Sequence, residues 1–197
     1  MKFRSTVGQA PMVGFCEALL QGIAPDGGLY VPEKFPSVDL TDFAGASTPA
    51  QVGAIMLAPF ARGSELEASL PVICQEAFSF PIPLKSIPSD AGPLHVLELF
   101  HGPTAAFKDV GARFLAACFE RLNGSEQLPL TILVATSGDT GGAVAAAFHG
   151  RANTRVVVLF PKGLVSGRQE KQLCCWGDNV LSLRVNGNFD DCQRMVK

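Results

Sequence analysis

A single lysine stands at the point where an apolar run gives way to a helical pattern. Residues Leu94–Phe100 are mostly apolar, and the run ends at His101. Beyond Lys108, apolar side chains recur every four residues, which predicts one apolar helix face formed by Val110, Phe114, Cys118 and Leu122. The first turn of a helix carries unpaired N–H groups and a partial positive charge. It therefore favours an acid such as Asp109 and disfavours a cation.

Two interpretations of Lys108 are open on these local grounds. An amine held between backbone dipoles and an apolar neighbour such as Phe107 loses part of its preference for the charged form and becomes a nucleophile. Alternatively, Lys108 is an ordinary lysine whose ammonium group reaches water. The local pattern by itself favours the solvated lysine, because most lysines are solvated.

A second loop suited to ligand binding follows the next strand-like run, at Val134–Ala143. It carries three hydroxyl groups, on Thr136, Ser137 and Thr140. Its glycines, including Gly138, allow close approach of the backbone, and a helix N-terminus presents N–H groups to a carboxylate or a phosphate. The loop matches neither the Walker A nor the dinucleotide-binding pattern. A tight strand–helix turn capped by Asp139 or Thr140 is the alternative.

The elements around both loops alternate in the manner of an α/β domain with a parallel sheet and right-handed crossovers. Short apolar runs predict strands buried on both faces at Leu94–Phe100, Thr131–Ala135, Arg155–Phe160 and Val180–Val185. Helical patterns fall at Asp109–Leu122, Thr140–His149, Arg168–Trp176 and from Asn188 to Lys197. Ligands bind such sheets at the carboxyl ends of the strands, where both loops are expected. The last helical pattern stops without a cap, which predicts a truncated chain.

The first part of the chain reads differently, as a largely helical region. Helical patterns cover Val13–Ala24, Gln51–Ala61 and Glu65–Phe78, the second preceded by a Thr48-Pro49 cap and the third interrupted or restarted at Pro71. The segment Asp26–Pro32 predicts a turn that leads into a short extended stretch. Prolines between residues 81 and 93 mark a boundary or a loop. We therefore expect an N-terminal region at 1–85 and an α/β domain at 86–197.

Composition narrows the class of protein. The 197 residues are 47% hydrophobic, enough for one core or for one domain and part of another. Lys and Arg total 16 against 18 Asp and Glu, and no basic stripe indicates nucleic acid. No run has the length of a membrane span, and no secretory signal is present, so we expect a cytoplasmic protein. Six cysteines without C-x-x-C or zinc spacing predict free, mostly buried thiols and no metal site.

Several motifs together, in order along nearly the whole chain, closely resemble the threonine synthase family of fold-type II pyridoxal-phosphate (PLP) enzymes. The two strongest are His101–Asp109 and Ala135–Gly141, and the weaker ones are Asp26–Pro32, Leu159–Gly163, Gln169–Lys171 and Gly187–Cys192. The resemblance implies a tryptophan synthase β-like fold with a parallel sheet flanked by helices. It also implies PLP as cofactor and a role in threonine biosynthesis.

The resemblance also implies roles for particular residues. Lys108 would hold PLP as a Schiff base and then act as general base and acid, and Phe107 would lie beside the cofactor. Asp139 occupies the place where related enzymes often have an asparagine that contacts the pyridine hydroxyl. The loop of Thr136, Ser137, Gly138 and Thr140 would receive the substrate carboxylate.

The implied reaction converts O-phospho-L-homoserine and water to L-threonine and phosphate. The cofactor acts as an electron sink for proton removal, phosphate leaves from Cγ, and water adds at Cβ. The partner is thus a small-molecule substrate, without a nucleic acid or a membrane. The sequence leaves the oligomeric state open.

Length is the main departure from the family, whose members are considerably longer. The glycine-rich loop for the cofactor phosphate and the group that faces the pyridine nitrogen would lie beyond Lys197. The 197-residue piece alone is therefore expected to be inactive. Two alternatives remain: another fold-type II lyase, such as a threonine/serine dehydratase or a phospho-lyase, and a non-catalytic, truncated ligand-binding domain.

Overall fold

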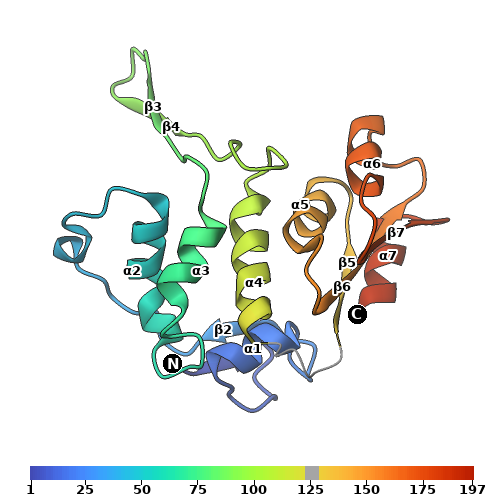
Figure 1. Ribbon diagram of the computed structural model, residues 1–197, viewed down its shortest axis with the longest axis horizontal. Coiled ribbons are helices and arrows are strands. Elements are labelled where there is room, and N and C mark those ends of the chain that lie inside the picture. The colour runs from blue at the N-terminus through green and yellow to red at the C-terminus, as the bar shows by residue number, and fades with distance from the viewer. Residues whose placement is uncertain (123–128) are drawn as a thin grey trace. The chain divides into compact units, whose positions relative to one another are not determined.

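The computed structural model describes residues 1–122 and 129–197. The described residues divide into two compact units (Figure 1). The first unit contains residues 1–79 together with 117–122, and the second contains 80–116 and, among the described residues, 129–197. Helix α4 (Lys108–Leu122) begins in the second unit, and its last residues, from Ala117, belong to the first.

The first unit is largely helical, as its sequence pattern predicts. Strands β1 (Phe3–Ser5) and β2 (Tyr30–Pro32) form a small antiparallel pair. The helices are α1 (Phe15–Gln21), the 3-10 helix η1 (Leu40–Phe43), α2 (Pro49–Ala61) and α3 (Leu70–Ala77). Helix α1 is shorter than the expected range Val13–Ala24, because Val13 instead forms an isolated antiparallel bridge with Phe3.

The helix starts in this unit follow directly from local chemistry. The Thr48 hydroxyl accepts a hydrogen bond from the Gln51 N–H, and the Gln51 side chain accepts one from the Thr48 N–H. This reciprocal cap, with Pro49 as first helical residue, confirms the predicted start of α2. Pro71 lies in the first turn of α3, so it restarts a helix there and does not break one.

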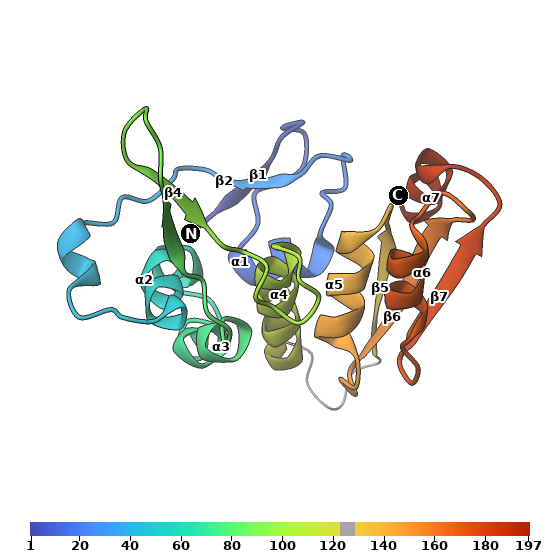
Figure 2. The same ribbon diagram turned by 90° about the horizontal axis from the view of Figure 1, so that it is seen from above.

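A parallel three-stranded sheet forms the centre of the second unit. Its order is β5 (Leu130–Ala135), β6 (Thr154–Pro161) and β7 (Val180–Val185), close to the predicted strands. Helices α5 (Asp139–Phe148) and α7 (Phe189–Val196) lie on opposite sides of this sheet (Figures 1 and 2). Helix α6 (Gly167–Cys174) packs against α5 and β7. Strand β6 is the most buried, with Val156, Val158 and Phe160 almost fully enclosed.

The prediction of a buried parallel strand at Leu94–Phe100 is wrong. Strand β4 (Leu94–Leu97) pairs antiparallel with β3 (Leu84–Ile87), and every residue of both strands is exposed. Strand β3 was not predicted, because the prolines on either side of it obscure its short pattern. An apolar run alone does not distinguish a central parallel strand from one arm of an exposed hairpin.

Within residues 1–122 and 129–197, no helix is long and apolar enough to cross a bilayer.

Candidate functional site

Lys108 is the first residue of α4, at the position predicted from the sequence. Its side chain is half-buried, and its Nζ lies 4.3 Å from the centre of the Phe107 ring. A cation this close to an aromatic face is attracted to the ring. In the described parts of the chain, Lys108 forms no ion pair with a carboxylate. Its amine is thus held by an aromatic surface beside a helix N-terminus.

Asp109 holds the loop of residues 101–107, which precedes Lys108 and is named the lysine loop. Its side chain is fully buried, its Oδ1 accepts a hydrogen bond of 2.7 Å from the Thr104 hydroxyl, and its Oδ2 accepts one of 2.9 Å from the Thr104 N–H. A Cβ on Gly102 would lie 2.5 Å from Asp109 Oδ2, so glycine is required for the loop to wrap this closely. Ala105 has a φ of 57°, a strained value for alanine, at the tip of the loop.

Sequence reasoning assigned Asp109 only a favourable interaction with the helix dipole, and it gave Thr104 no role. The structure shows that both residues shape the lysine loop through their hydrogen bonds. The available sequence signal was general: threonine and aspartate often form local hydrogen bonds in turns and at helix starts.

Thr136 holds the shape of the second loop, residues 136–140, which is named the hydroxyl loop. It is 2% exposed, its hydroxyl accepts hydrogen bonds from the N–H groups of Gly138 and Gly141, and it donates one of 3.0 Å to the Gly138 carbonyl. The hydroxyl is therefore occupied by the loop backbone. Gly141 must be glycine here, because its Cβ would lie 2.5 Å from Thr136 Cγ2.

The remaining groups of the second loop lie open at the start of α5. Ser137, Asp139 and Thr140 are exposed, while Gly138 is buried with a φ of 155°. The first turn of α5 also provides backbone N–H groups that lack helical partners. Together these groups form a surface suited to a carboxylate, and the turn follows the carboxyl end of β5.

Helix α6 contacts both loops, and this contact was not foreseen. Gln169 Nε2 donates a hydrogen bond of 3.0 Å to Asp139 Oδ1, and Gln172 Nε2 donates one of 3.2 Å to the Thr104 carbonyl. The lysine loop and the hydroxyl loop are thus brought to the same helix. Gln169 belongs to the Gln169–Lys171 motif of the resemblance, but neither glutamine was assigned a role, because their partners are 30 and 68 residues away.

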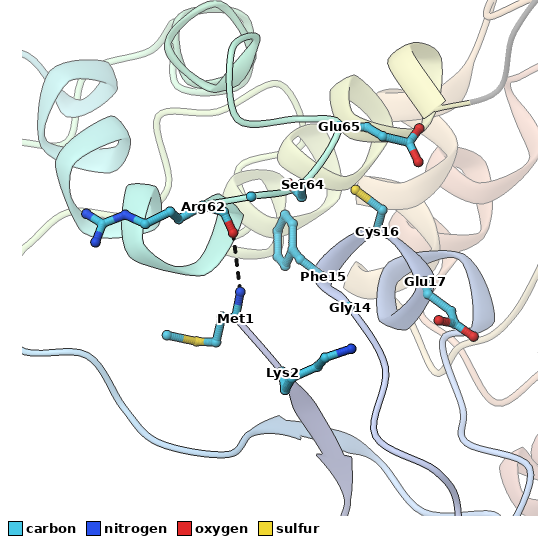
Figure 3. A pocket seen from close by; sticks show the side chains of 10 residues that line it. Met1, Lys2, Gly14, Phe15, Cys16, Glu17, Arg62, Ser64 and Glu65 are labelled. Carbon is cyan, nitrogen blue, oxygen red and sulfur yellow. Dashed lines mark hydrogen bonds between the residues drawn. The ribbon is translucent and has the colours of Figure 1, made fainter.

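The first unit contains a separate cavity of about 480 Å³ (Figure 3). Phe15 and Cys16 lie on one side of it and Arg62 on another, and the terminal amino group donates a 3.3 Å hydrogen bond to the Arg62 carbonyl. The charged groups around the cavity do not converge on one point. We find no cluster of metal-ligating side chains in the described parts of the chain.

The cysteines are free, as predicted, but only Cys74, Cys118 and Cys192 are buried. Burial raises the pKa of the Cys74 thiol to about 11 and that of Cys118 to about 12. Both thiols are therefore protonated and unreactive at neutral pH.

A half-buried lysine at a helix start, beside a hydroxyl-bearing loop at the end of a parallel strand, agrees with the family relationships of the sequence. Residues 81–197 match the family described as pyridoxal-phosphate dependent enzyme, and the chain belongs to that family. Residues 2–78 match the family described as threonine synthase N terminus. The fold type and the resemblance inferred from the motifs are both confirmed.

Individual relatives point to the same branch of the family. The chain is 40% identical over 205 residues to threonine synthase of Escherichia coli, and 38% identical over 216 residues to that of Saccharomyces cerevisiae. It superposes on the crystal structure of the Escherichia coli enzyme with a TM-score of 0.88 and 38% identity, covering 99% of this chain. The PLP-bound threonine synthase of Brucella melitensis gives a TM-score of 0.84 and 42% identity, with 100% of this chain covered.

These matches cover only part of each relative. The chain spans 45% of the Escherichia coli sequence and 42% of the yeast sequence, and 45% and 43% of the two superposed crystal chains. The chain is therefore similar to the N-terminal portion of threonine synthases.

Proposed function

We propose that the protein to which this chain belongs converts O-phospho-L-homoserine and water to L-threonine and phosphate with PLP as cofactor. One observation carries the proposal: Lys108 and an anion-suited loop are attached to the same helix in a chain of the PLP-dependent family. The match of residues 2–78 to the threonine synthase N terminus favours this reaction over other reactions of the family.

The residues around Lys108 fit a covalently held aldehyde cofactor. Its amine is half-buried, lies against the Phe107 ring and is free of a carboxylate partner among the described residues, so it is available for bond formation. Phe107, which is 59% exposed, offers an aromatic surface beside it. When bound, the cofactor supplies an electron sink that stabilises negative charge at the substrate carbons.

The second loop would bind the substrate carboxylate. Ser137 and Thr140 supply exposed hydroxyl groups, and the N–H groups of the first turn of α5, apart from that of Gly141, complete the anion site. Gly138 permits the close approach of the backbone. Thr136 contributes by holding the loop in shape, since its own hydroxyl is occupied.

Two further roles are proposed for charged groups. Asp139 would face the cofactor from the start of α5, with its orientation set by the bond from Gln169. Lys108 would carry protons between the substrate carbons once its amine is free, as the resemblance to the family implies. The proposed proton carrier, Lys108, and the proposed orienting acid, Asp139, thus belong to separate loops.

The proposal has a direct test in the full-length protein. The wild type should release threonine and phosphate in equal amounts from phosphohomoserine, and borohydride should fix the cofactor onto the peptide that contains Lys108. The Lys108→Ala variant should lose both properties, while Lys85→Ala, at an exposed lysine of β3, should keep them. Release of a 2-oxo acid instead of threonine from phosphohomoserine would indicate a phospho-lyase, and release of one from threonine or serine would indicate a dehydratase. A colourless, unlabelled protein would indicate a non-catalytic domain.

We further propose that the protein acts in the cytoplasm on small molecules, and that its N-terminal region and α/β domain divide near residues 85 and 86. Free thiols at all six cysteines support a reducing compartment.

A further inference from the structure

Gln169 uses both ends of its side-chain amide. Its Oε1 accepts hydrogen bonds from the Ser166 hydroxyl (2.9 Å) and the Ser166 N–H (3.3 Å), which cap the start of α6. Its Nε2 donates to Asp139 Oδ1 and would lie only 2.3 Å from a Cβ on Gly138. The partners fix the orientation of the amide, because the acceptor end faces donors and the donor end faces a carboxylate. Gln169 thus covers the glycine and holds the acid of the hydroxyl loop.

Gln172 contacts the lysine loop in the way that Gln169 contacts the hydroxyl loop. Its Nε2 donates to the Thr104 carbonyl, and its side chain lies in ordinary contact distance of Gly142, at 3.5 Å from a Cβ built there. Its own carbonyl accepts a 2.7 Å hydrogen bond from Trp176 Nε1, which ties the end of α6 to this turn. Thr104 is the residue whose N–H and hydroxyl bind Asp109.

Helix α6 is itself anchored to α5 and β7, so the contacts of its two glutamines can fix the positions of the two loops. Leu173 is fully buried and would lie 2.8 Å from a Cβ on Gly141, which shows how closely α6 and α5 pack. The Ser182 hydroxyl of β7 donates to the Leu173 carbonyl. A helix anchored near its C-terminal end by a buried leucine gives its two glutamines defined positions.

A continuous path of contacts therefore joins the two loops. It runs from Lys108 through the adjacent Asp109 to Thr104, then to Gln172, along one turn of α6 to Gln169, and finally to Asp139. Residues three apart on a helix lie on the same face, which is why both glutamines reach toward the loops. Every member of the path lies in the second unit.

We propose that Gln169 and Gln172 are positioning residues that set the distance between the Lys108 amine and the hydroxyl loop, which would bind the substrate carboxylate. The proposal rests on the proposed function for its catalytic consequence, while its structural content stands on the contacts alone. Neither glutamine touches the reacting atoms. They act through Asp139 and Thr104, and a small displacement of a reacting group lowers turnover steeply.

Hydrogen–deuterium exchange in the cofactor-free, full-length protein tests the structural content. The Gln172→Ala variant should exchange faster in the peptide that covers residues 101–108, and Gln169→Ala should do so in the peptide over 136–140. For Gln172→Ala the free energy of unfolding should stay close to that of the wild type, and for Gln169→Ala it should fall by no more than the loss of one helix cap explains. The matched control is Gln193→Ala on α7, outside both loops, which should leave both peptides unchanged.

Glutamate variants separate hydrogen bonding from space filling. Gln172→Glu keeps the shape but presents only acceptor oxygens to the Thr104 carbonyl, and Gln169→Glu sets a second carboxylate against Asp139. Each should be at least as impaired as the alanine variant. A glutamate variant that behaves like the wild type would overturn the proposal, because filling the space would then be sufficient.

Steady-state kinetics on phosphohomoserine supply the catalytic readout. For Gln172→Ala we expect kcat to fall by about 10-fold to 100-fold with KM little changed, since the lysine and not the carboxylate site is displaced. For Gln169→Ala we expect KM to rise as well. Normal kinetics together with unchanged exchange would refute the positioning role. A wild type without turnover would refute the proposed function but leave the exchange test valid.

Discussion

At the scale of single residues, the buried carboxylate of Asp109 determines the shape of the lysine loop. A charge without exposure needs partners, and Asp109 has the hydroxyl and the N–H of Thr104. Its place in the first turn of α4 adds the favourable helix dipole. The hydrogen bonds are the larger effect, because a bond to a buried charge contributes about 1.5–3 kcal/mol and the dipole about 0.3–1 kcal/mol.

We therefore predict that Asp109→Ala lowers the free energy of unfolding of the full-length protein by about 2–3 kcal/mol, because the variant leaves the Thr104 donors unpaired. Asp190→Ala is the matched control, since Asp190 is an exposed acid in the first turn of α7. It should cost less than about 1 kcal/mol. Urea unfolding measures both variants, and equal losses would show that the dipole alone matters.

Asp26 fixes the N-terminal loop through the same kind of chemistry. The Ser5 hydroxyl donates to its Oδ1 at 2.6 Å, and the N–H groups of Gln9, Ala10 and Gly28 also donate to its carboxylate. The Ser5 hydrogen bond, with help from the backbone donors, lowers the pKa of Asp26 from 3.8 to about 2, although partial desolvation opposes the shift. The ionised form is therefore favoured in the folded protein.

The stability that Asp26 contributes should be fully present above pH 3.8 and be lost as the pH falls toward about 2. Replacing it with asparagine should remove this part of the acid dependence. The measurement compares thermal unfolding of the wild type and of Asp26→Asn, in steps of about one pH unit from pH 6 down to pH 2. Parallel curves for the two proteins would contradict the prediction.

At the scale of elements, the approach of α5 and α6 depends on Gly141. A Cβ at this position would lie 2.5 Å from Thr136 Cγ2 and 2.8 Å from Leu173 Cδ2, and both neighbours are buried. Neither can move aside without disturbing the sheet or the hydroxyl loop. The helix propensity of alanine is better than that of glycine, but the steric conflict is the larger effect.

Gly141→Ala should consequently destabilise the protein by about 1–3 kcal/mol. Gly111 of α4 provides the matched substitution, because nothing lies within 4 Å of a Cβ built there. Gly111→Ala should be neutral or stabilise the protein by up to about 1 kcal/mol. Denaturant midpoints of the two variants give the answer, and a stabilising Gly141→Ala would show that α6 can retreat.

At the scale of the whole molecule, large apolar surfaces remain uncovered in the second unit. Leu133 and Leu181 flank Val157 in one row across the sheet and are 46% and 54% exposed. The hairpin adds Leu84 and Leu97, at 62% and 53%. Exposed apolar areas of this kind mark surfaces that other parts of a protein or a partner cover.

Residues 1–197 on their own should therefore bind PLP weakly and show no turnover of phosphohomoserine. The physical reason is that the chain spans only 45% of the Escherichia coli relative, so under the proposed function the lysine loop and the hydroxyl loop would form only one wall of the site. Threonine release by the isolated piece, compared with the full-length protein at equal concentration, is the measurement. Turnover by the piece at the rate of the full-length protein would contradict the prediction.

Much of the fold follows from local sequence. The Thr48-Pro49 cap and the three parallel strands depend on neighbouring residues, and their positions were predicted to within a few residues. At Pro71 the pattern left open whether the helix is interrupted or restarted, and the structure shows a restart. The place of Lys108 at the start of α4 was predicted in the same way. Local hydrogen bonds and hydrophobic periodicity determine such features, so a linear pattern contains them.

Other features were decided by tertiary structure alone. The direction and exposure of β4 depend on its pairing with β3, and the link between the two loops depends on Gln169 and Gln172, whose partners are far away in sequence. The sequence by itself, through its resemblance to the family, indicated the groups that we propose for the chemistry, Lys108 among them. Only the packing of α6 against α5 decided that these groups are held together, because contacts between distant residues leave no periodic trace in a single chain.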